Sequence, residues 1–169
     1  MVKRCRGNHS LAIKTDGTLW AWGTNSVNSQ LGLGDVTNRS SPAQVGALTN
    51  WLSVAGGFNH TIALKTDGTL WSWGRNNVGQ LVLGNITNYS SPKQVGALAN
   101  WLSVAGGYRH TIALKTDGSL WTWGWNNQGQ LGLGTSGAGT YKSSPAQVGA
   151  LTTWLSIAGS YRHTIATRS

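Results

Sequence analysis

Residues 110–124 read HTIALKTDGSLWTWG, residues 60–74 read HTIALKTDGTLWSWG, and residues 9–23 read HSLAIKTDGTLWAWG. A fourth copy begins at residue 163 with HTIA and then leaves the pattern. Near-identical segments at a regular interval indicate a fold assembled from equivalent units that stack on one another. The repeat therefore decides the fold of this chain.

The interval of the repeat is about 50 residues. Equivalent histidines are 51, 50 and 53 residues apart, at His9, His60, His110 and His163. A second element, WLS(V/I)AG, recurs at residues 51, 101 and 154. We expect a single repeat domain over 1–169, with units at approximately 1–50, 51–100 and 101–153 and a partial unit at 154–169.

Each unit predicts four short β-strands. In the third unit, strands are expected at 110–115, 120–123, 145–148 and 154–158, since these segments are apolar, β-branched or rich in Trp. Asp117-Gly118 predicts a two-residue hairpin in which glycine takes a positive φ. The segment NNQGQLGLG at 126–134 is expected to be a loop. Four strands in this period favour an all-β propeller blade over the shorter coil of a β-solenoid.

The recurring pattern HTIALKTDGxLWxWGxNxxGQLGLG resembles the repeat of the regulator of chromosome condensation family. The resemblance covers almost the whole chain and implies a β-propeller of four-stranded blades. It implies blade-building roles for His60, Trp73, Gly74, Asn76, Gly79, Gln80, Leu81 and Gly84. Members of that family exchange nucleotide on a small GTPase, bind chromatin or inhibit β-lactamases, so the resemblance alone leaves the function open.

About three blades and a partial one are fewer than the four to eight that close a propeller. The first unit lacks a good copy of the WLSVAGG strand, because residues 1–7 read MVKRCRG. The last unit carries a surplus copy, formed by Trp154, Leu155, Ser156, Ile157, Ala158 and Gly159. We expect this strand to complete the first unit of another copy, since an open sheet edge favours such pairing.

Head-to-tail pairing of this kind would make the protein its own partner. It gives a homo-oligomeric ring if the rotation closes and a filament if it does not. The primary prediction is therefore a self-assembling, non-enzymatic scaffold. The alternative is that the sequence is a fragment of a longer propeller.

Composition excludes several classes of partner. The net charge of +9 arises mainly from a lack of acidic residues, since there are four Asp and no Glu, and no basic run suggests a nucleic-acid partner. No apolar segment approaches the roughly 18 residues of a membrane span, so no membrane is expected. No signal peptide pattern is visible, and the compartment stays open, secretion included.

No catalytic, metal or cofactor site is predicted. Asp16, Asp67 and Asp117 lie in TDG turns, which leaves only Asp35 for acid–base chemistry. The histidines occur once per unit and are expected to be packed and hydrogen-bonded. The LGLG segments are not followed by GK[ST], so they do not predict a phosphate loop.

The tryptophans divide into two groups. We expect one group to fill the gaps between blades, namely Trp22, Trp51, Trp73, Trp101, Trp123 and Trp154. Trp125 differs, because its equivalents are Thr24 and Arg75 and the repeat does not require it.

Positions that vary between near-identical units are not dictated by the fold. They lie just before each repeated histidine and just after each WG pair: Phe58, Asn59, Arg75, Tyr108, Arg109, Trp125, Tyr161 and Arg162. Aromatic residues and Arg are typical of interface hot spots, and they also stack on sugars or bases. These residues therefore predict a binding site for another protein, of GTPase or chromatin type if the resemblance extends to partners. A glycan-binding module and neutral surface variation are the alternatives.

Overall fold

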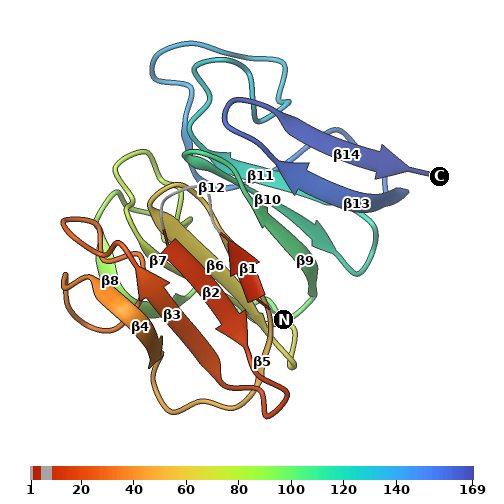
Figure 1. The fold of residues 1–169 in the computed structure, drawn as a ribbon. Helices are drawn as coiled ribbons and strands as arrows, with labels where there is room; N and C mark the ends of the chain where they lie inside the picture. The colour runs from red at the N-terminus through yellow and green to blue at the C-terminus, as the bar shows by residue number, and fades with distance from the viewer. Residues whose placement is uncertain (1, 5–8) are drawn as a thin grey trace.

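The structure is a computed structural model that describes residues 2–4 and 9–169. All the regular structure in these residues is β, which confirms the predicted fold class. Their strands form four antiparallel sheets, arranged in chain order along the molecule (Figure 1). Within the described ranges no helix is long and apolar enough to cross a membrane.

The first three sheets have four strands each and are called blades 1, 2 and 3. Blade 1 holds β1 (Val2–Arg4), β2 (His9–Ile13), β3 (Leu19–Gly23) and β4 (Arg39–Gln44). Blade 2 holds β5 (Trp51–Gly56), β6 (His60–Lys65), β7 (Leu70–Gly74) and β8 (Tyr89–Gln94). Blade 3 holds β9 (Trp101–Gly106), β10 (His110–Lys115), β11 (Leu120–Gly124) and β12 (Lys142–Gln147). The half blade consists of β13 (Trp154–Gly159) and β14 (Thr164–Arg168).

The inner strands β1, β5, β9 and β13 each form one edge of their sheet, and neighbouring inner strands contact each other. Glycine makes this approach possible. A Cβ on Gly106 would lie 2.7 Å from the carbonyl carbon of Gly56, and one on Gly159 would lie 2.5 Å from the carbonyl oxygen of Gly106. The WLS(V/I)AG motif thus ends in glycine because the sheets meet there, in the manner of propeller blades.

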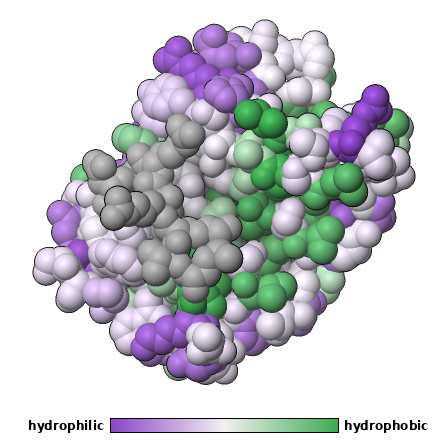
Figure 2. Space-filling view, turned by 45° about the vertical axis from the view of Figure 1, so that its right-hand side comes forward, coloured by the Kyte–Doolittle hydropathy of each residue, from purple (hydrophilic) through white to green (hydrophobic). Residues whose placement is uncertain are grey.

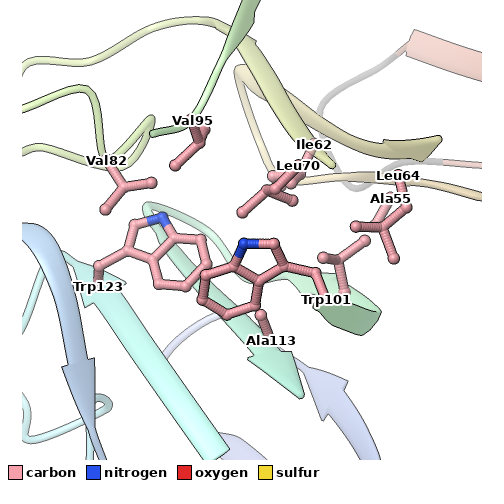
Figure 3. Packing of buried hydrophobic residues seen from close by; sticks show 10 residues of the cluster. Ala55, Ile62, Leu64, Leu70, Val82, Val95, Trp101, Ala113 and Trp123 are labelled. Carbon is pink, nitrogen blue, oxygen red and sulfur yellow. The ribbon is translucent and has the colours of Figure 1, made fainter. Parts of the chain in front are cut away.

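The core lies between the blades. Trp73 and Trp123 are fully buried, and their indole N–H groups donate to the carbonyl oxygens of Gln30 and Gln80 on the preceding blade, both at 3.0 Å. Figure 3 shows Trp123 and Trp101 packed among aliphatic side chains of blade 2. Trp51 packs in the same way between blades 1 and 2. The gap-filling role predicted for these four tryptophans is confirmed.

The TDG turns differ in detail from the prediction. Leu114 pairs with Leu120, Lys115 N–H donates to Ser119 O, and Gly118 N–H donates to Lys115 O. The loop therefore has three residues, 116–118, and the expected two-residue hairpin is wrong. Glycine does take the predicted positive φ, +77° at Gly118, as the third residue of the loop. The aspartate caps the turn, since Asp117 Oδ1 accepts bonds from Ser119 N–H at 2.9 Å and its hydroxyl at 2.6 Å.

The outer strand of blade 3 begins earlier than expected. β12 starts at Lys142 rather than at Pro145, and its register to β11 shifts between Thr122 and Gly124. Proline is tolerated inside this strand because β12 is an edge strand and one side of it has no ladder partner.

The first unit has its own inner strand, so the expected vacancy there is wrong. β1 pairs with β2, with Val2 opposite Ala12 and Arg4 opposite Ser10. Backbone pairing does not need the WLSVAGG side chains, which is why MVKRCRG can still supply a strand. β1 has three residues, whereas β5 has six, and β13 is already paired with β14 of the same chain. Completion of a blade between chains stays a prediction.

Candidate functional site

The segments that join each inner strand to the next strand lie side by side at one end of the sheets. Phe58 N–H donates to Tyr108 O, and Tyr108 N–H donates to Ser160 O, both at 3.2 Å. These bonds bring the rings together: the centroids of Phe58 and Tyr108 are 4.6 Å apart, and Tyr108 and Tyr161 are stacked at 4.2 Å. The repeat thus places one aromatic residue per unit into a continuous row.

Trp125 joins this row from the end of β11. The backbone N–H of Trp125 donates to Arg109 O at 2.8 Å. Its ring meets that of Tyr108 edge-on with a centroid distance of 6.2 Å. Arg75 holds the same place in blade 2, where its N–H donates to Asn59 O at 2.8 Å. The residues just before the histidine and just after the WG pair therefore lie together in space. We call Phe58, Tyr108, Tyr161, Trp125, Arg75, Arg109 and Arg162 the aromatic–arginine row.

The arginines lie along the rings. The guanidinium carbon of Arg109 is 5.1 Å from the centroid of Tyr108, and that of Arg162 is 5.3 Å from Tyr161. Arg75 Nε donates to Asn77 Oδ1 at 2.9 Å, and burial together with the charge of Arg109 lowers the pKa of Arg75. An arginine with a lowered pKa remains charged at neutral pH, so the row is strongly cationic.

No carboxylate neutralises these arginines within the described ranges, 2–4 and 9–169, where the ion pair found is Arg39–Asp35. The other three aspartates lie in the TDG turns, where bonds from the residue two positions on lower their pKa values. Arg109 Nε is buried and makes no hydrogen bond to a described group. The row therefore offers unpaired positive charge beside flat apolar faces.

A cavity of about 590 Å³ lies at the blade 1 end of the row. Phe58, Asn59 and Arg75 line one part of it, and the loop residues Thr24 and Asn88 line another. Its lining combines one ring, one cation and several amide and hydroxyl groups. Such a surface can bind extended segments that carry acidic and apolar groups.

The repeated histidines serve packing between blades. His60 is fully buried, and its Nε2 lies 3.1 Å from Thr111 Oγ1, whose hydroxyl donates to Gln80 O at 3.1 Å. Burial lowers the pKa of His60 to about 3 and that of His110 to about 4, so both imidazoles are neutral at physiological pH. His163 is exposed instead, and the expectation of a packed residue is wrong there because none of the sheets in the described residues covers it.

Groups of three or more potential metal ligands are absent from the part of the chain that the structure describes. Cys5 lies outside the described residues. Sequence reasoning missed a repeated role of lysine: Lys65 Nζ lies 3.7 Å from the ring centroid of Trp71, and Lys115 lies 3.9 Å from that of Trp121. The recurrence of Lys in KTDG, six positions before Trp, was the available signal.

Comparison with known families supports the fold. A family profile described as the regulator of chromosome condensation (RCC1) repeat matches residues 16–64, 67–114 and 117–167. Similar curated proteins include an X-linked retinitis pigmentosa GTPase regulator homolog of Caenorhabditis elegans, 42% identical over 80 residues, which are 45% of this chain and 6% of that protein. Human protein RCC2 is 42% identical over 74 residues, 43% of this chain and 14% of that protein.

The ultraviolet-B receptor UVR8 of Arabidopsis thaliana is 37% identical over 78 residues, 45% of this chain and 18% of the receptor. The chain thus spans less than a fifth of these relatives.

Solved structures with the same fold include Prp20p from Saccharomyces cerevisiae, with a TM-score of 0.83, 23% identity, and coverage of 94% of this chain and 41% of that one. A structure of Kap60 bound to yeast RCC1 (Prp20) gives a TM-score of 0.82 at 25% identity, with coverage of 96% and 38%. The chain therefore has the blade geometry of these propellers over about two fifths of their length.

Proposed function

Because the chain belongs to the regulator of chromosome condensation repeat family, we propose that it is a non-enzymatic, protein-binding propeller module. Its binding surface is the aromatic–arginine row, and its partner is an acidic protein segment with apolar or aromatic side chains. The observation that carries this proposal is that Arg109 and Arg162 lie beside the stacked rings of Tyr108 and Tyr161 without a carboxylate partner among the described residues.

The relatives support a protein partner in general terms. Kap60 is bound to yeast Prp20 in one of the similar structures, and other relatives are named as a GTPase regulator homolog and an ultraviolet-B receptor. These names describe different activities, and the chain spans only part of each relative. We therefore base the chemistry of the partner on the row itself and leave a GTPase- or chromatin-type partner as one possibility within that class.

Peptide selection tests this proposal. A phage-displayed library of random 12-residue peptides, selected on the full chain, should yield sequences rich in Asp and Glu together with Trp, Tyr or Leu. Trp125→Ala and Arg109→Gln should each weaken a selected peptide by about tenfold or more, since each removes a central contact. Arg168→Gln is the matched control, because it removes the same charge from an exposed residue on β14, at the opposite end of that strand from Thr164.

Selected peptides without acidic enrichment, or equal binding by all three variants, would contradict the proposal. An oligosaccharide array separates the glycan alternative: neutral sugars bound through Trp125 and not through Arg109 would favour a glycan-binding module. Because stacking on a sugar needs the ring and not the guanidinium, the two variants respond differently in the two cases.

Self-assembly is the second candidate, and the observation that favours it is the exposure of β13. The surplus strand β13 is half-exposed or exposed along its length, unlike β5 and β9, whose first residues are buried. Strand complementation would have to displace β1 from its place on β2.

A further inference from the structure

One wall of the cavity at the blade 1 end of the row is a loop with a strained backbone. The segment 24–30 is one residue longer than its equivalent in blade 2, and it turns through Val27 at φ +69° and Ser29 at φ +58°. The other two blades place glycine at this bend, Gly79 and Gly129. A left-handed conformation is strained for a β-branched residue, and such strain is concentrated at binding sites. Val27 lines the cavity and is 82% exposed, so burial in the core does not explain its conformation.

Two amide side chains of the cavity have their oxygen atoms occupied. Asn77 Oδ1 accepts a hydrogen bond from Arg75 Nε at 2.9 Å, and Asn88 Oδ1 accepts one from Asn76 N–H at 2.8 Å. The bond to Asn77 also orients the guanidinium of Arg75 and leaves its two terminal nitrogen atoms free to donate. None of the described residues that line the cavity is acidic. The cavity therefore presents hydrogen-bond donors that suit an anion.

A second cation lies beside the cavity. The ring of Phe58, which lines the cavity, is 4.6 Å from that of Tyr108, and the guanidinium carbon of Arg109 is 5.1 Å from the Tyr108 centroid. Arg75 and Arg109 thus flank one pair of rings. The pKa of Arg75 is lowered by burial and then by the charge of Arg109, so the two guanidinium groups are near enough to repel each other. Arg109 Nε is buried and makes no hydrogen bond to a described group, and an anion would relieve both conditions.

The inner strands differ in chemistry at their two ends. Leu52 and Leu102, the second residues of β5 and β9, are each more than half exposed, and Figure 2 shows hydrophobic residues gathered on one face. Phe58 and Tyr108 follow the last residues of the same two strands. The row end therefore joins flat rings to cations, whereas the other end exposes aliphatic side chains.

We infer that the acidic group recognised by the row is a phosphate monoester on a tyrosine of the partner, bound at the mouth of the cavity between Arg75 and Arg109. This inference rests on the proposed function and specifies its ligand. A phosphate monoester has a charge of about −1.5 to −2 at pH 7 and three acceptor oxygens, so it can pair with both arginines and accept from the amides. A carboxylate has one charge and two oxygens, and it would leave one arginine unpaired. Tyrosine is the carrier because its ring can lie against Phe58 and Val27.

The test scans a peptide obtained by the selection described above and binds it to the full chain. Each position in turn carries tyrosine, phosphotyrosine, sulfotyrosine or glutamate. Calorimetry should find a position at which phosphotyrosine binds about tenfold or more tightly than the other three residues. Sulfotyrosine has the same three oxygens with a single charge, so it isolates the contribution of the second charge. Equal binding of the sulfated and phosphorylated forms, or no position at which phosphate strengthens binding, would overturn the inference.

The repeat itself supplies variants for the two arginines. Arg75→Thr and Arg109→Asn introduce the residues that blades 1 and 2 have at the equivalent positions, so the blade should accept both. Each should reduce the advantage of the phosphorylated over the unphosphorylated peptide to about threefold or less. Arg168→Gln is the matched control, since it removes the same charge from exposed β14 and should leave this advantage unchanged. An equal reduction in Arg168→Gln would mean that only the net charge matters and would contradict the inference. Circular dichroism of each variant confirms that it is folded.

Phenyl phosphate and benzoate separate failure of this inference from failure of the proposed function. The side-chain Nε–H signals of the isotope-labelled full chain report on each arginine by nuclear magnetic resonance. Phenyl phosphate should shift the signals of Arg75 and Arg109, and it should bind more tightly than benzoate. If acidic peptides bind but phenyl phosphate has no such preference, the inference is wrong and the proposed function stands. If phenyl phosphate shifts both arginines but no acidic peptide is selected, the phosphate site is supported and the acidic segment is overturned.

Discussion

The interface between blades 2 and 3 and the surface between blade 3 and the half blade are built from nearly the same sequence, yet they differ in packing. Trp123, Thr111 and His60 are buried at the first, while a cavity of about 420 Å³ beside Gln130 and Gly132 remains at the second, where Thr164 is only half-buried. The difference teaches that the repeat does not bury its own aromatic residues. Burial comes from the neighbouring unit, as in other repeat proteins whose stability is a sum over adjacent units.

The largest effect on this comparison should come from removing an internal indole. Trp123→Ala leaves a cavity and removes one of the two hydrogen bonds to the Gln80 carbonyl, and we expect it to lower the free energy of unfolding by about 3–5 kcal/mol. Trp22→Ala removes a half-buried indole and should cost less than about 1 kcal/mol in dilute, monomeric protein. Urea unfolding of the two variants measures both values, and similar losses would mean that the blades do not depend on each other as described.

The next largest loss of stability should come from acid, which protonates the histidines buried at the internal interfaces. The folded-state pKa values of His60 and His110 lie near 3 and 4, below the ordinary value of 6.5, so the unfolded chain binds protons first as the pH falls. Stability is therefore full above pH 6.5 and decreases towards pH 4, by about 1.4 kcal/mol per pH unit for each histidine. Unfolding in urea at pH 7.5 and at pH 5.0 should differ by about 2 kcal/mol for each of the two.

The aspartates of the TDG turns do not share this pH range, because their pKa values lie below 3.8. His60→Gln should reduce the pH dependence between 6.5 and 4, because it removes one of the two buried imidazoles. An unchanged slope in His60→Gln would show that other groups cause the acid sensitivity.

A smaller effect is expected from a single hydroxyl. Thr111→Val leaves the buried Gln80 carbonyl and His60 Nε2 with one partner fewer, and should cost about 1–2 kcal/mol. The equivalent change Thr164→Val lies in a half-exposed strand and should cost less in the monomer. Thermal unfolding at low concentration ranks the two, and a larger loss for Thr164→Val would reverse the comparison.

The fold could be predicted from the repeat because the strands of each unit are marked by apolar, β-branched or Trp-rich segments. His110–Lys115 was predicted with its observed bounds, and the strand at Trp154 to within one residue. The three-residue turn at 116–118 was missed because Asp-Gly fits two hairpin types, and only the strand register separates them. β1 was missed because it is held by backbone pairing, which does not require a recognisable side-chain pattern in MVKRCRG.

The candidate site could be predicted only as a set of positions. Variation between the units identified Tyr108, Arg109 and Trp125, but not that the rings of Phe58 and Tyr161 both contact the ring of Tyr108. These contacts depend on the close approach of adjacent inner strands, which Gly106 and Gly159 permit. The binding role of the row remains a prediction.

The link from threonine to the preceding histidine and glutamine has a consequence for how the molecule opens. Each blade is hydrogen-bonded to the one before it through this threonine. In the described residues the half blade has such a bond on one side only, through Thr164. Thermal fraying should therefore start at β14 and travel towards the N-terminus, one unit at a time. Amide protons of β14 should exchange with solvent well before those of β6 and β10.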